Sequence, residues 1–279
     1  MAPGLEGKVA IVTGAARHRG IGRAIAMRLA DDGAHIVAVG SSRAAEDFPE
    51  DEKSIGWRGV HSVLEDVHAL GRDGLAMDAD LTQPADAERI VDETMAKFGR
   101  IDILVNNAGL AFCGEKNLWE IPDDEWYRVI DVNLNGVYLL TSRALRRMVE
   151  AGNGGRIVNI SSSAGRMGVP QYGAYCATKW GIVGLTQMIA LEAAPHRITV
   201  NCVAPGSVDT DMMDGTFRHM ASRFGSEAAQ MKQLVVRTIA LGRQGRPDDI
   251  AGAVAFFASE DAAWITGQTL NVNGGTPMS

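Results

Sequence analysis

Short apolar runs rich in β-branched residues alternate along the chain with longer segments of helical period. The runs are continuously apolar, which is typical of parallel strands buried on both faces. The pattern predicts strands at Val9–Thr13, Ile36–Val39, Leu75–Met77, Ile101–Asn106, Arg156–Ile160, Thr199–Ala204 and Thr269–Val272. It predicts helices at Gly22–Asp31, Val60–Leu70, Pro84–Phe98, Asp123–Glu150, Tyr172–Glu192 and Pro247–Ala258. This alternation favours an α/β fold, a single doubly wound parallel sheet with helices on both faces.

Two segments interrupt this rhythm, although no repeat or linker divides the chain, and we interpret residues 1–279 as one domain. Residues Ser41–Gly59 are charged and contain a proline; they either fold over a ligand or form a solvated excursion, and we favour the second. Residues 205–245 form a long excursion that we interpret as a substrate lid, because long loops in compact domains are usually functional. Its methionines either line the substrate site or fill the core of an amphipathic helix. They are Met212, Met213, Met220 and Met231.

Composition and charge narrow the function classes. The chain has 279 residues, of which 46% are hydrophobic, and a formal net charge of −7, which argues against binding nucleic acid or anionic membranes. Its three cysteines lie far apart and form no metal-binding pair, which suits a reducing compartment. The first residues lack the apolar stretch of a signal peptide, and no run approaches the roughly 18 apolar residues of a membrane helix. We expect a cytoplasmic protein without a metal site.

Glycines follow the first predicted strand at the point where a helix begins. The segment runs from Thr13-Gly14 to Gly20-Ile21-Gly22. Glycines there permit a tight turn and close approach of the backbone to a pyrophosphate at the helix N-terminus. Because glycines also mark ordinary turns, the motif predicts a dinucleotide site only through its strand-to-helix position.

Tyr175 and Lys179 are four residues apart on one predicted helix, so their side chains share a face. A neighbouring cation favours the phenolate and makes tyrosine, whose free pKa is about 10, a workable proton donor and acceptor. A surface lysine beside a half-buried tyrosine is the alternative for this spacing alone. Ser162 argues against that alternative, because it follows a predicted strand, where doubly wound sheets place their ligands.

These motifs, in this order, resemble the short-chain dehydrogenase/reductase family from end to end. The resemblance implies a Rossmann fold and a catalytic tetrad of Asn133, Ser162, Tyr175 and Lys179. It also implies hydride transfer between a nicotinamide cofactor and a carbonyl or secondary alcohol, with Tyr175 exchanging the proton and Ser162 holding the substrate oxygen. Lys179 is expected to lower the pKa of Tyr175 and bind the nicotinamide ribose, and Asn133 to anchor a water. The cofactor-binding residues implied by the family motifs are Gly14, Gly20, Ile21, Gly22, Asp80, Leu81, Asn107, Ala108, Gly109, Tyr175, Lys179, Pro205, Gly206, Val208 and Thr210.

The glycine loop departs from the family pattern. The family usually places three residues between the first two glycines, whereas this chain has five, Ala15 to Arg19. We expect the loop to bulge, which leaves open which backbone N–H groups meet the pyrophosphate.

The end of the second predicted strand indicates the cofactor. NAD enzymes usually carry an acid there that binds the ribose 2′-hydroxyl, but in this chain the strand ends at Gly40. Hydroxyls and guanidinium groups, which suit a 2′-phosphate, follow it and also occur in the lengthened loop. We therefore favour NADP(H); solvent-facing arginines, or Glu46 and Asp47 reaching back to the ribose, would instead allow NAD(H). The residues assigned to the phosphate are Ser41, Ser42, Arg43, Arg17 and Arg19.

The sequence indicates less about the substrate and the oligomeric state than about the cofactor. Candidate pocket residues are mostly apolar and permit anything from a small diketone to a steroid. Besides the lid they are Phe112, Ala164, Arg166, Met167, Val169 and Tyr172. From Ala174 to Leu191 the only charged residue is Lys179, so that helix is apolar nearly all round and its second face predicts a homotetramer.

Two other functions stay open. One is 3-oxoacyl carrier-protein reductase, in which an arginine cluster faces an acidic carrier; a solvated helix face is the alternative that we favour for these arginines. They are Arg143, Arg146 and Arg147. The other is a catalytically inactive nucleotide-sensing protein, which would be expected to lose the tyrosine or the lysine.

Overall fold

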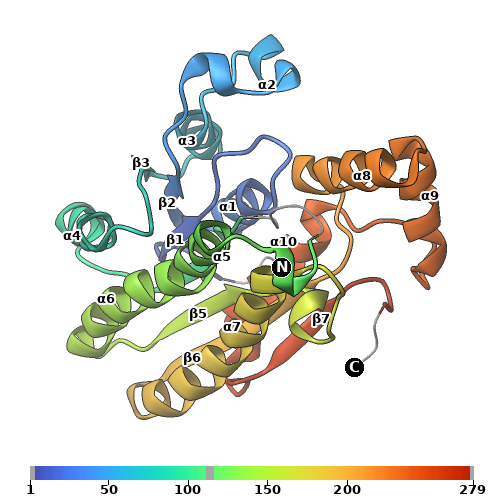
Figure 1. Ribbon diagram of the computed structural model, residues 1–279. Helices are drawn as coiled ribbons and strands as arrows, with labels where there is room; N and C mark the ends of the chain where they lie inside the picture. Colours follow the sequence, from blue (N-terminus) through green and yellow to red (C-terminus); the bar gives the residue numbers. More distant parts are fainter. Residues whose placement is uncertain (1–3, 111–115, 277–279) are drawn as a thin grey trace.

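Seven parallel strands form one sheet in a computed structural model that describes residues 4–110 and 116–276. The strand order is β3-β2-β1-β4-β5-β6-β7, and Figure 1 shows the helices that flank it. The strands are β1 (Val9–Thr13), β2 (His35–Gly40), β3 (Gly74–Asp78), β4 (Ile103–Asn106), β5 (Gly155–Ile160), β6 (Ile198–Pro205) and β7 (Thr269–Val272). The doubly wound parallel sheet predicted from the sequence is confirmed.

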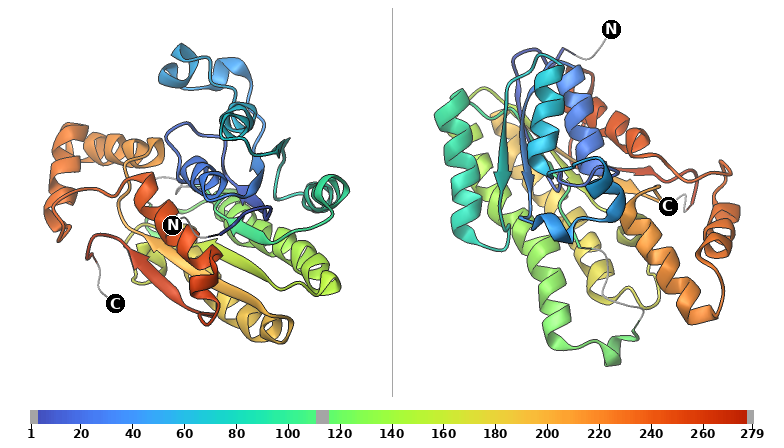
Figure 2. Two further views of the ribbon diagram at one scale, coloured as in Figure 1. Left: turned by 180° about the vertical axis from the view of Figure 1, so that it is seen from behind. Right: turned by 90° about the horizontal axis from the view of Figure 1, so that it is seen from above.

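The sheet is covered on both faces, as the layers in Figure 2 show. Along β1, Ala10 and Val12 pack into one core, whereas Val9 and Ile11 pack into the other, because successive strand side chains point to opposite faces. The first core is covered by α1 (Ile21–Asp31), α3 (Val60–Ala69) and α10 (Pro247–Ala258). The second is covered by α4 (Pro84–Phe98), α6 (Gly136–Ala151) and α7 (Gly173–Ala193).

The helix predicted from Asp123 to Glu150 is not continuous. It divides into α5 (Asp123–Ile130), a π-helical turn (Asp131–Asn135) and α6. Asn133 lies in the turn, and its fully buried amide is hydrogen-bonded to the backbone of Leu110, far away in the sequence. Periodicity does not reveal this interruption, because the Asn133 contact that accompanies it involves Leu110, which lies far outside the helical segment. The other predicted helices differ from the structure by at most one residue at either end.

The segment 41–59 is mostly exposed, as a solvated excursion predicts, but two of its buried side chains pack onto the glycine loop. It contains a short 3₁₀ turn (Ala45–Asp47) and α2 (Glu50–Ser54). Glu52 is fully buried, and the indole Nε1 of Trp57 donates a 2.8 Å hydrogen bond to the carbonyl of Ala16. These two residues therefore hold the segment against the predicted glycine loop.

The lid consists of α8 (Asp211–Phe224) and α9 (Ala228–Thr238), which form a small core of their own. Met231 is buried against Phe217, with Met213 and Met220 beside it, whereas the side chain of Met212 is exposed. Three of the four methionines therefore fill the lid core, as the amphipathic interpretation predicts. The lid leaves and rejoins the body where Val208 pairs with Gly245.

Candidate active site

The predicted site segments that follow strands lie at the carboxyl ends of the sheet, whereas Asn133 lies in the π-helical turn and Tyr175 and Lys179 lie on α7. The glycine loop follows β1, Ser41–Arg43 follow β2, Asp80 follows β3 closely, and Ser162 follows β5. The sheet order reverses between β1 and β4, and open α/β sheets bind ligands at such a switch point. The fold thus brings together residues that are far apart along the chain.

Ser162 and Tyr175 form the reactive centre. Ser162 begins a 3₁₀ turn (Ser163–Gly165), and its hydroxyl accepts a 3.2 Å hydrogen bond from the amide of Ala164. A side-chain hydrogen bond also joins Ser162 to Tyr175, which is half-buried on the first turns of α7. Burial raises the pKa of Tyr175 above that of a free tyrosine, and the hydrogen bond from Ser162 opposes this change. At neutral pH the phenol is therefore protonated and poised to donate.

Lys179 is buried directly behind Tyr175. Its Nζ donates a 2.9 Å hydrogen bond to the carbonyl of Ile160 and lies 5.5 Å from the centre of the Tyr175 ring. Burial lowers the pKa of Lys179 to about 8. The expected lowering of the Tyr175 pKa by Lys179 was wrong for this structure, because burial dominates and the opposing contribution comes from Ser162.

Asn133 supports this centre through the backbone. Its Oδ1 accepts a 2.7 Å hydrogen bond from the amide of Leu110, and its Nδ2 donates to the Leu110 carbonyl and to the Thr178 hydroxyl at 3.1 and 3.4 Å. A Cβ atom at Gly109 would lie 3.3 Å from Asn133 Oδ1 and 3.6 Å from Lys179 Nζ, so glycine keeps this approach open. The role of Asn133 in anchoring a water stays a prediction.

Thr13 joins residues 106–109, Asn-Asn-Ala-Gly, to the glycine loop, a contact that was not predicted from the sequence. The hydroxyl of Thr13 accepts hydrogen bonds from the amides of Asn107 and Ala108, both at 3.0 Å. The side chain of Asn107 donates in return to the Thr13 carbonyl at 2.9 Å. A hydroxyl residue at the end of the first strand was the only sequence signal for this contact.

The glycine loop fits a pyrophosphate. Gly14 has φ +67°, and a Cβ there would lie 2.8 Å from the Cα of Ala108, while a Cβ at Gly22 would lie 2.3 Å from the carbonyl of Gly14. Gly20 is the N-cap of α1, and no side chain caps the helix. The first-turn amides of Ile21 and Gly22 are therefore available to an anion, as a dinucleotide requires.

Arg17 and Arg19 are not placed as predicted. Arg17 is hydrogen-bonded through Nε to Glu52 at 3.0 Å and through Nη2 to Asp211 at 2.6 Å. Arg19 contacts Asp211 and Asp214 at 3.3 and 3.0 Å. Both guanidinium groups are thus paired with carboxylates and neither faces solvent alone, so the structure supports neither a 2′-phosphate role nor the solvated alternative. The acids lie on distant segments, which is why the sequence did not reveal them.

The residues after β2 and β3 lie at the surface. Ser41, Ser42 and Arg43 are exposed, and Arg43 packs over the Phe48 ring at 5.7 Å without an ion pair to any described carboxylate. Asp80 is exposed, with its Oδ1 accepting a 3.0 Å hydrogen bond from the amide of Thr82. Leu81 follows Asp80 and packs at the edge of the second core.

The segment after β6 leads into the lid. Pro205 ends β6, and Gly206 approaches Asn273 so closely that a Cβ would lie 2.7 Å from its Cβ. Val208 is buried in the base of the lid, and Thr210 caps α8 by accepting a 3.3 Å hydrogen bond from the amide of Met213. These residues therefore fix where the lid starts.

The residues predicted to line the substrate pocket include neighbours of the reactive centre. Tyr172 packs edge-on against Tyr175, with ring centres 6.0 Å apart, and Ala164 is buried, whereas Met167 is exposed. Arg223 of α8 hydrogen-bonds to the side chain of Gln171, which brings the lid to the pocket mouth. Phe112 lies outside the described residues.

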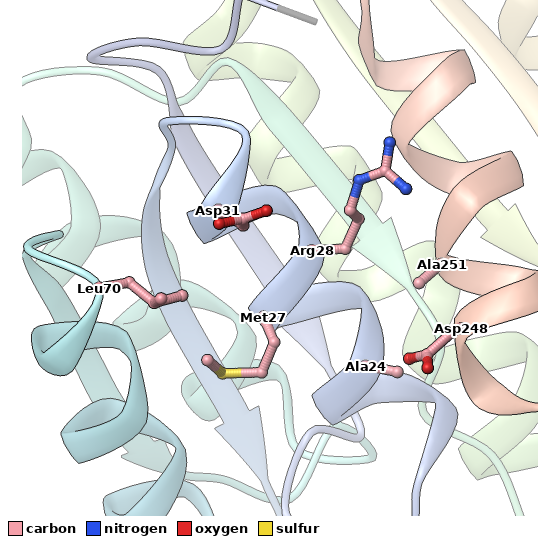
Figure 3. Close-up of a pocket in the computed structure, with 7 residues that line it drawn as sticks. All are labelled: Ala24, Met27, Arg28, Asp31, Leu70, Asp248 and Ala251. Atoms are coloured by element: carbon pink, nitrogen blue, oxygen red, sulfur yellow. The ribbon is translucent and has the colours of Figure 1, made fainter. Parts of the chain in front are cut away.

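A surface cavity of about 360 Å³ lies elsewhere, between α1 and α10 (Figure 3). Its lining residues include Met27, Leu70 and Ala251, and none of them belongs to the predicted site. Among residues 4–110 and 116–276 no group of His, Cys, Asp or Glu side chains could hold a metal ion. No described helix is long and apolar enough to span a bilayer.

Several known proteins are similar to this chain in sequence and in architecture. Residues 14–277 match a family model described as Enoyl-(Acyl carrier protein) reductase. The chain is 40% identical over 270 residues to a short-chain dehydrogenase/reductase of Armillaria gallica, covering 97% of this chain and 96% of that protein. It is 38% identical over 273 residues to the 3-oxoacyl-[acyl-carrier-protein] reductase of Staphylococcus aureus (strain Mu50), covering 97% and 98%. The crystal structure of carveol dehydrogenase from Mycobacterium avium in complex with NAD has a TM-score of 0.87 and 32% identity, covering 98% of this chain and 99% of that one.

Proposed function

The chain belongs to the short-chain dehydrogenase/reductase family of oxidoreductases, and from this premise we propose that it reduces a ketone to a secondary alcohol at neutral pH. The observation that carries the proposal is the buried Lys179 behind Tyr175 and Ser162, beside a glycine loop that fits a pyrophosphate. The raised pKa of Tyr175 keeps its phenol protonated, as a proton donor to the substrate oxygen requires.

The residues divide the work as follows. A bound nicotinamide cofactor supplies or accepts the hydride. Ser162 donates a hydrogen bond to the substrate oxygen, and the Tyr175 phenol transfers its proton to that oxygen as the carbonyl is reduced. One N–H of the Lys179 ammonium donates to the Ile160 carbonyl, and its remaining N–H groups donate to the cofactor ribose. The apolar walls from Ala164 to Tyr172 and the lid hold the carbon skeleton.

The function is tested with a panel of ketones and alcohols followed by nicotinamide absorbance. Tyr175→Phe removes the proton donor, so we expect turnover to fall by about 10³-fold or more while the cofactor dissociation constant stays close to wild type. Lys179→Ala is expected both to lower turnover and to raise the cofactor dissociation constant. Substantial turnover by the phenylalanine variant would exclude the assigned mechanism.

The preferred cofactor is NADP(H), with NAD(H) as the weaker alternative. Gly40 puts no carboxylate at the end of β2, and the Arg43 guanidinium contacts the Asp47 carbonyl and the Phe48 ring but no described carboxylate, so it is available to a 2′-phosphate together with Ser41 and Ser42. Arg17 and Arg19 contribute nothing to this preference, because carboxylates occupy them.

The ratio of kcat/KM for NADPH over NADH tests this preference. We expect a ratio above one in the wild type and a drop of about 10-fold or more in Arg43→Ala, since a charge-assisted hydrogen bond is lost. Arg58→Ala is the control, because this exposed arginine on the same segment pairs with Glu65. A wild type that prefers NADH would refute NADP(H), and an unchanged ratio in Arg43→Ala would refute the role of Arg43.

A second candidate within the family is 3-oxoacyl carrier-protein reductase, the printed activity of the Staphylococcus aureus relative. The arginine cluster supports it weakly, because Arg143 pairs with Glu88 at 2.9 Å and Arg147 with Asp92 at 3.2 Å. Turnover of a 3-oxoacyl thioester with a rate comparable to the best ketone would favour this candidate. A nucleotide-sensing protein is disfavoured, since all four catalytic positions are retained.

We also propose that the protein is a cytoplasmic homotetramer.

A further inference from the structure

Polar contacts rather than hydrophobic packing join the lid to the body of the molecule, and one of them is the hydrogen bond from Arg223 to Gln171. Figures 1 and 2 show α8 and α9 standing away from the sheet, and among the described elements the only extensive packing of α8 is against α9. The lid core of Phe217, Ala221 and Met231 belongs to these two helices alone. Hydrophobic packing therefore holds the lid together but does not hold it in place.

Ion pairs connect the first turn of α8 to the glycine loop. Arg19 contacts three carboxylates, those of Asp209 and Asp211 at 3.3 Å and that of Asp214 at 3.0 Å. Arg17 contacts Asp211 at 2.6 Å. We call the whole set the ion cluster; its members are Arg17, Arg19, Glu52, Asp209, Asp211, Asp214 and Lys232.

Glu52 anchors the ion cluster in the body of the molecule. Its fully buried carboxylate accepts hydrogen bonds from Arg17 Nε at 3.0 Å and from the amide of His18 at 2.8 Å. These contacts point the far end of the Arg17 guanidinium toward Asp211. The ring of His18 packs edge-on against Trp57 of the same segment, which adds a second contact between that segment and the lengthened loop.

The position of the ion cluster relates it to the cofactor. Both arginines lie in the lengthened loop, directly before the α1 N-terminus that fits a pyrophosphate. Their carboxylate partners flank Thr210, which begins the lid. The cluster thus joins two separate walls of the proposed cofactor site.

We propose that Arg17 and Arg19 are positioning residues whose ion cluster latches the lid to the cofactor loop and thereby slows release of the nicotinamide cofactor. The proposal rests on the proposed function, because it concerns the cofactor of the same site. It assigns the lengthened loop a purpose other than reading the 2′-phosphate.

A double-mutant cycle on Arg19 and Asp214 tests the latch. Both side chains are partly exposed, so replacing them does not strand a buried charge. We expect Arg19→Gln and Asp214→Asn each to raise the NADPH dissociation rate constant in stopped flow by about three- to tenfold. The double variant should release NADPH no faster than Arg19→Gln alone, because the same contact is already lost. Additive effects, or unchanged rate constants, would overturn the latch.

A comparison of NADPH with NADH distinguishes the latch from recognition of the 2′-phosphate by Arg19. The latch predicts that Arg19→Gln accelerates release of NADPH and NADH by the same factor, whereas an effect confined to NADPH would overturn it. High salt should accelerate release from the wild type more than from the double variant, which keeps only the Arg17–Asp211 pair between the loop and α8. Arg72→Gln, which removes an ion pair with Glu6 at the amino ends of β1 and β3, should leave release unchanged.

Hydrogen exchange tests the latch without any cofactor. Amides of residues 211–224 should exchange faster in Arg19→Gln than in the wild type, while those of α10 stay unchanged. Equal protection of residues 211–224 in both proteins would refute the latch even if cofactor binding were never detected. Conversely, faster exchange in a protein that binds no nicotinamide would refute the proposed function and leave the lid contact established.

Discussion

At the scale of single residues, burial decides the protonation of the catalytic pair. It raises the pKa of Tyr175 and lowers that of Lys179 to about 8, because both charged forms lose hydration. A cofactor ribose accepts hydrogen bonds best from the charged ammonium. Binding should therefore weaken as pH rises through about 8, where Lys179 loses its proton in the cofactor-free protein. We expect the cofactor dissociation constant to rise by up to about tenfold between pH 8 and pH 9.

Calorimetry at pH 7, 8 and 9 measures this dependence, and the wild type should take up protons on binding above pH 8. Lys179→Met, which cannot titrate, is expected to bind weakly with a flat pH dependence. A similar slope in this variant would assign the titration to another group.

At the scale of elements, one buried side chain of the π-helical turn joins it to a distant segment of the chain. Asn133 is the one fully buried residue of the turn. Its side chain accepts a hydrogen bond from the amide of Leu110 and donates one to the carbonyl of Leu110. Asn133→Ala would leave the amide and carbonyl of Leu110 without these partners, so we expect a loss of about 1–3 kcal/mol in the free energy of unfolding. Displacement of Gly109 beside Lys179 should also lower kcat. Urea unfolding and initial rates measure the two effects.

Asn135→Ala is the matched control within the same turn. Asn135 is exposed, and its side chain donates only to Asp131 at 2.8 Å. We expect less than about 0.5 kcal/mol of destabilisation from this change. Equal losses in the two variants would show that the turn does not depend on the Leu110 contact.

At the scale of the whole molecule, α7 retains an apolar face that the fold does not cover. One face packs on the sheet through residues such as Ile182 and Ile189, yet Trp180, Met188 and Leu191 are 47%, 44% and 80% exposed. A second exposed apolar group lies near the edge strand β7, at Phe256, Trp264 and Leu270. Two separate apolar surfaces are what a tetramer with two-fold axes requires.

Light scattering at micromolar concentration should therefore report four chains. Met188→Arg is expected to reduce the assembly to dimers or monomers, because it places a charge in the buried contact. Ile55→Arg, at an exposed apolar position on the segment after β2, should leave the mass unchanged. A wild type that remains monomeric would refute the tetramer.

Much of the site followed from local sequence. The spacing of Tyr175 and Lys179 places them on one helix face, and the glycines of the loop and the unbroken apolar strands indicate their own conformations. The glycine loop and Ser162 each follow a predicted strand, and in the structure both lie at the carboxyl edge of the parallel sheet. Local pattern and connection rules sufficed because each of these features depends on residues a few positions apart.

The remaining features were decided by tertiary structure alone. Arg17 and Asp211 are separated by 194 positions, and Arg17 and Glu52 by 35, so no local pattern indicates their pairing. The π-helical turn likewise depends on Leu110, which lies 23 positions from Asn133. The pKa of Tyr175 depends on burial among several elements rather than on the adjacent lysine. Charge pairing and desolvation act through space, so the sequence specified these groups while only the folded chain determined their partners.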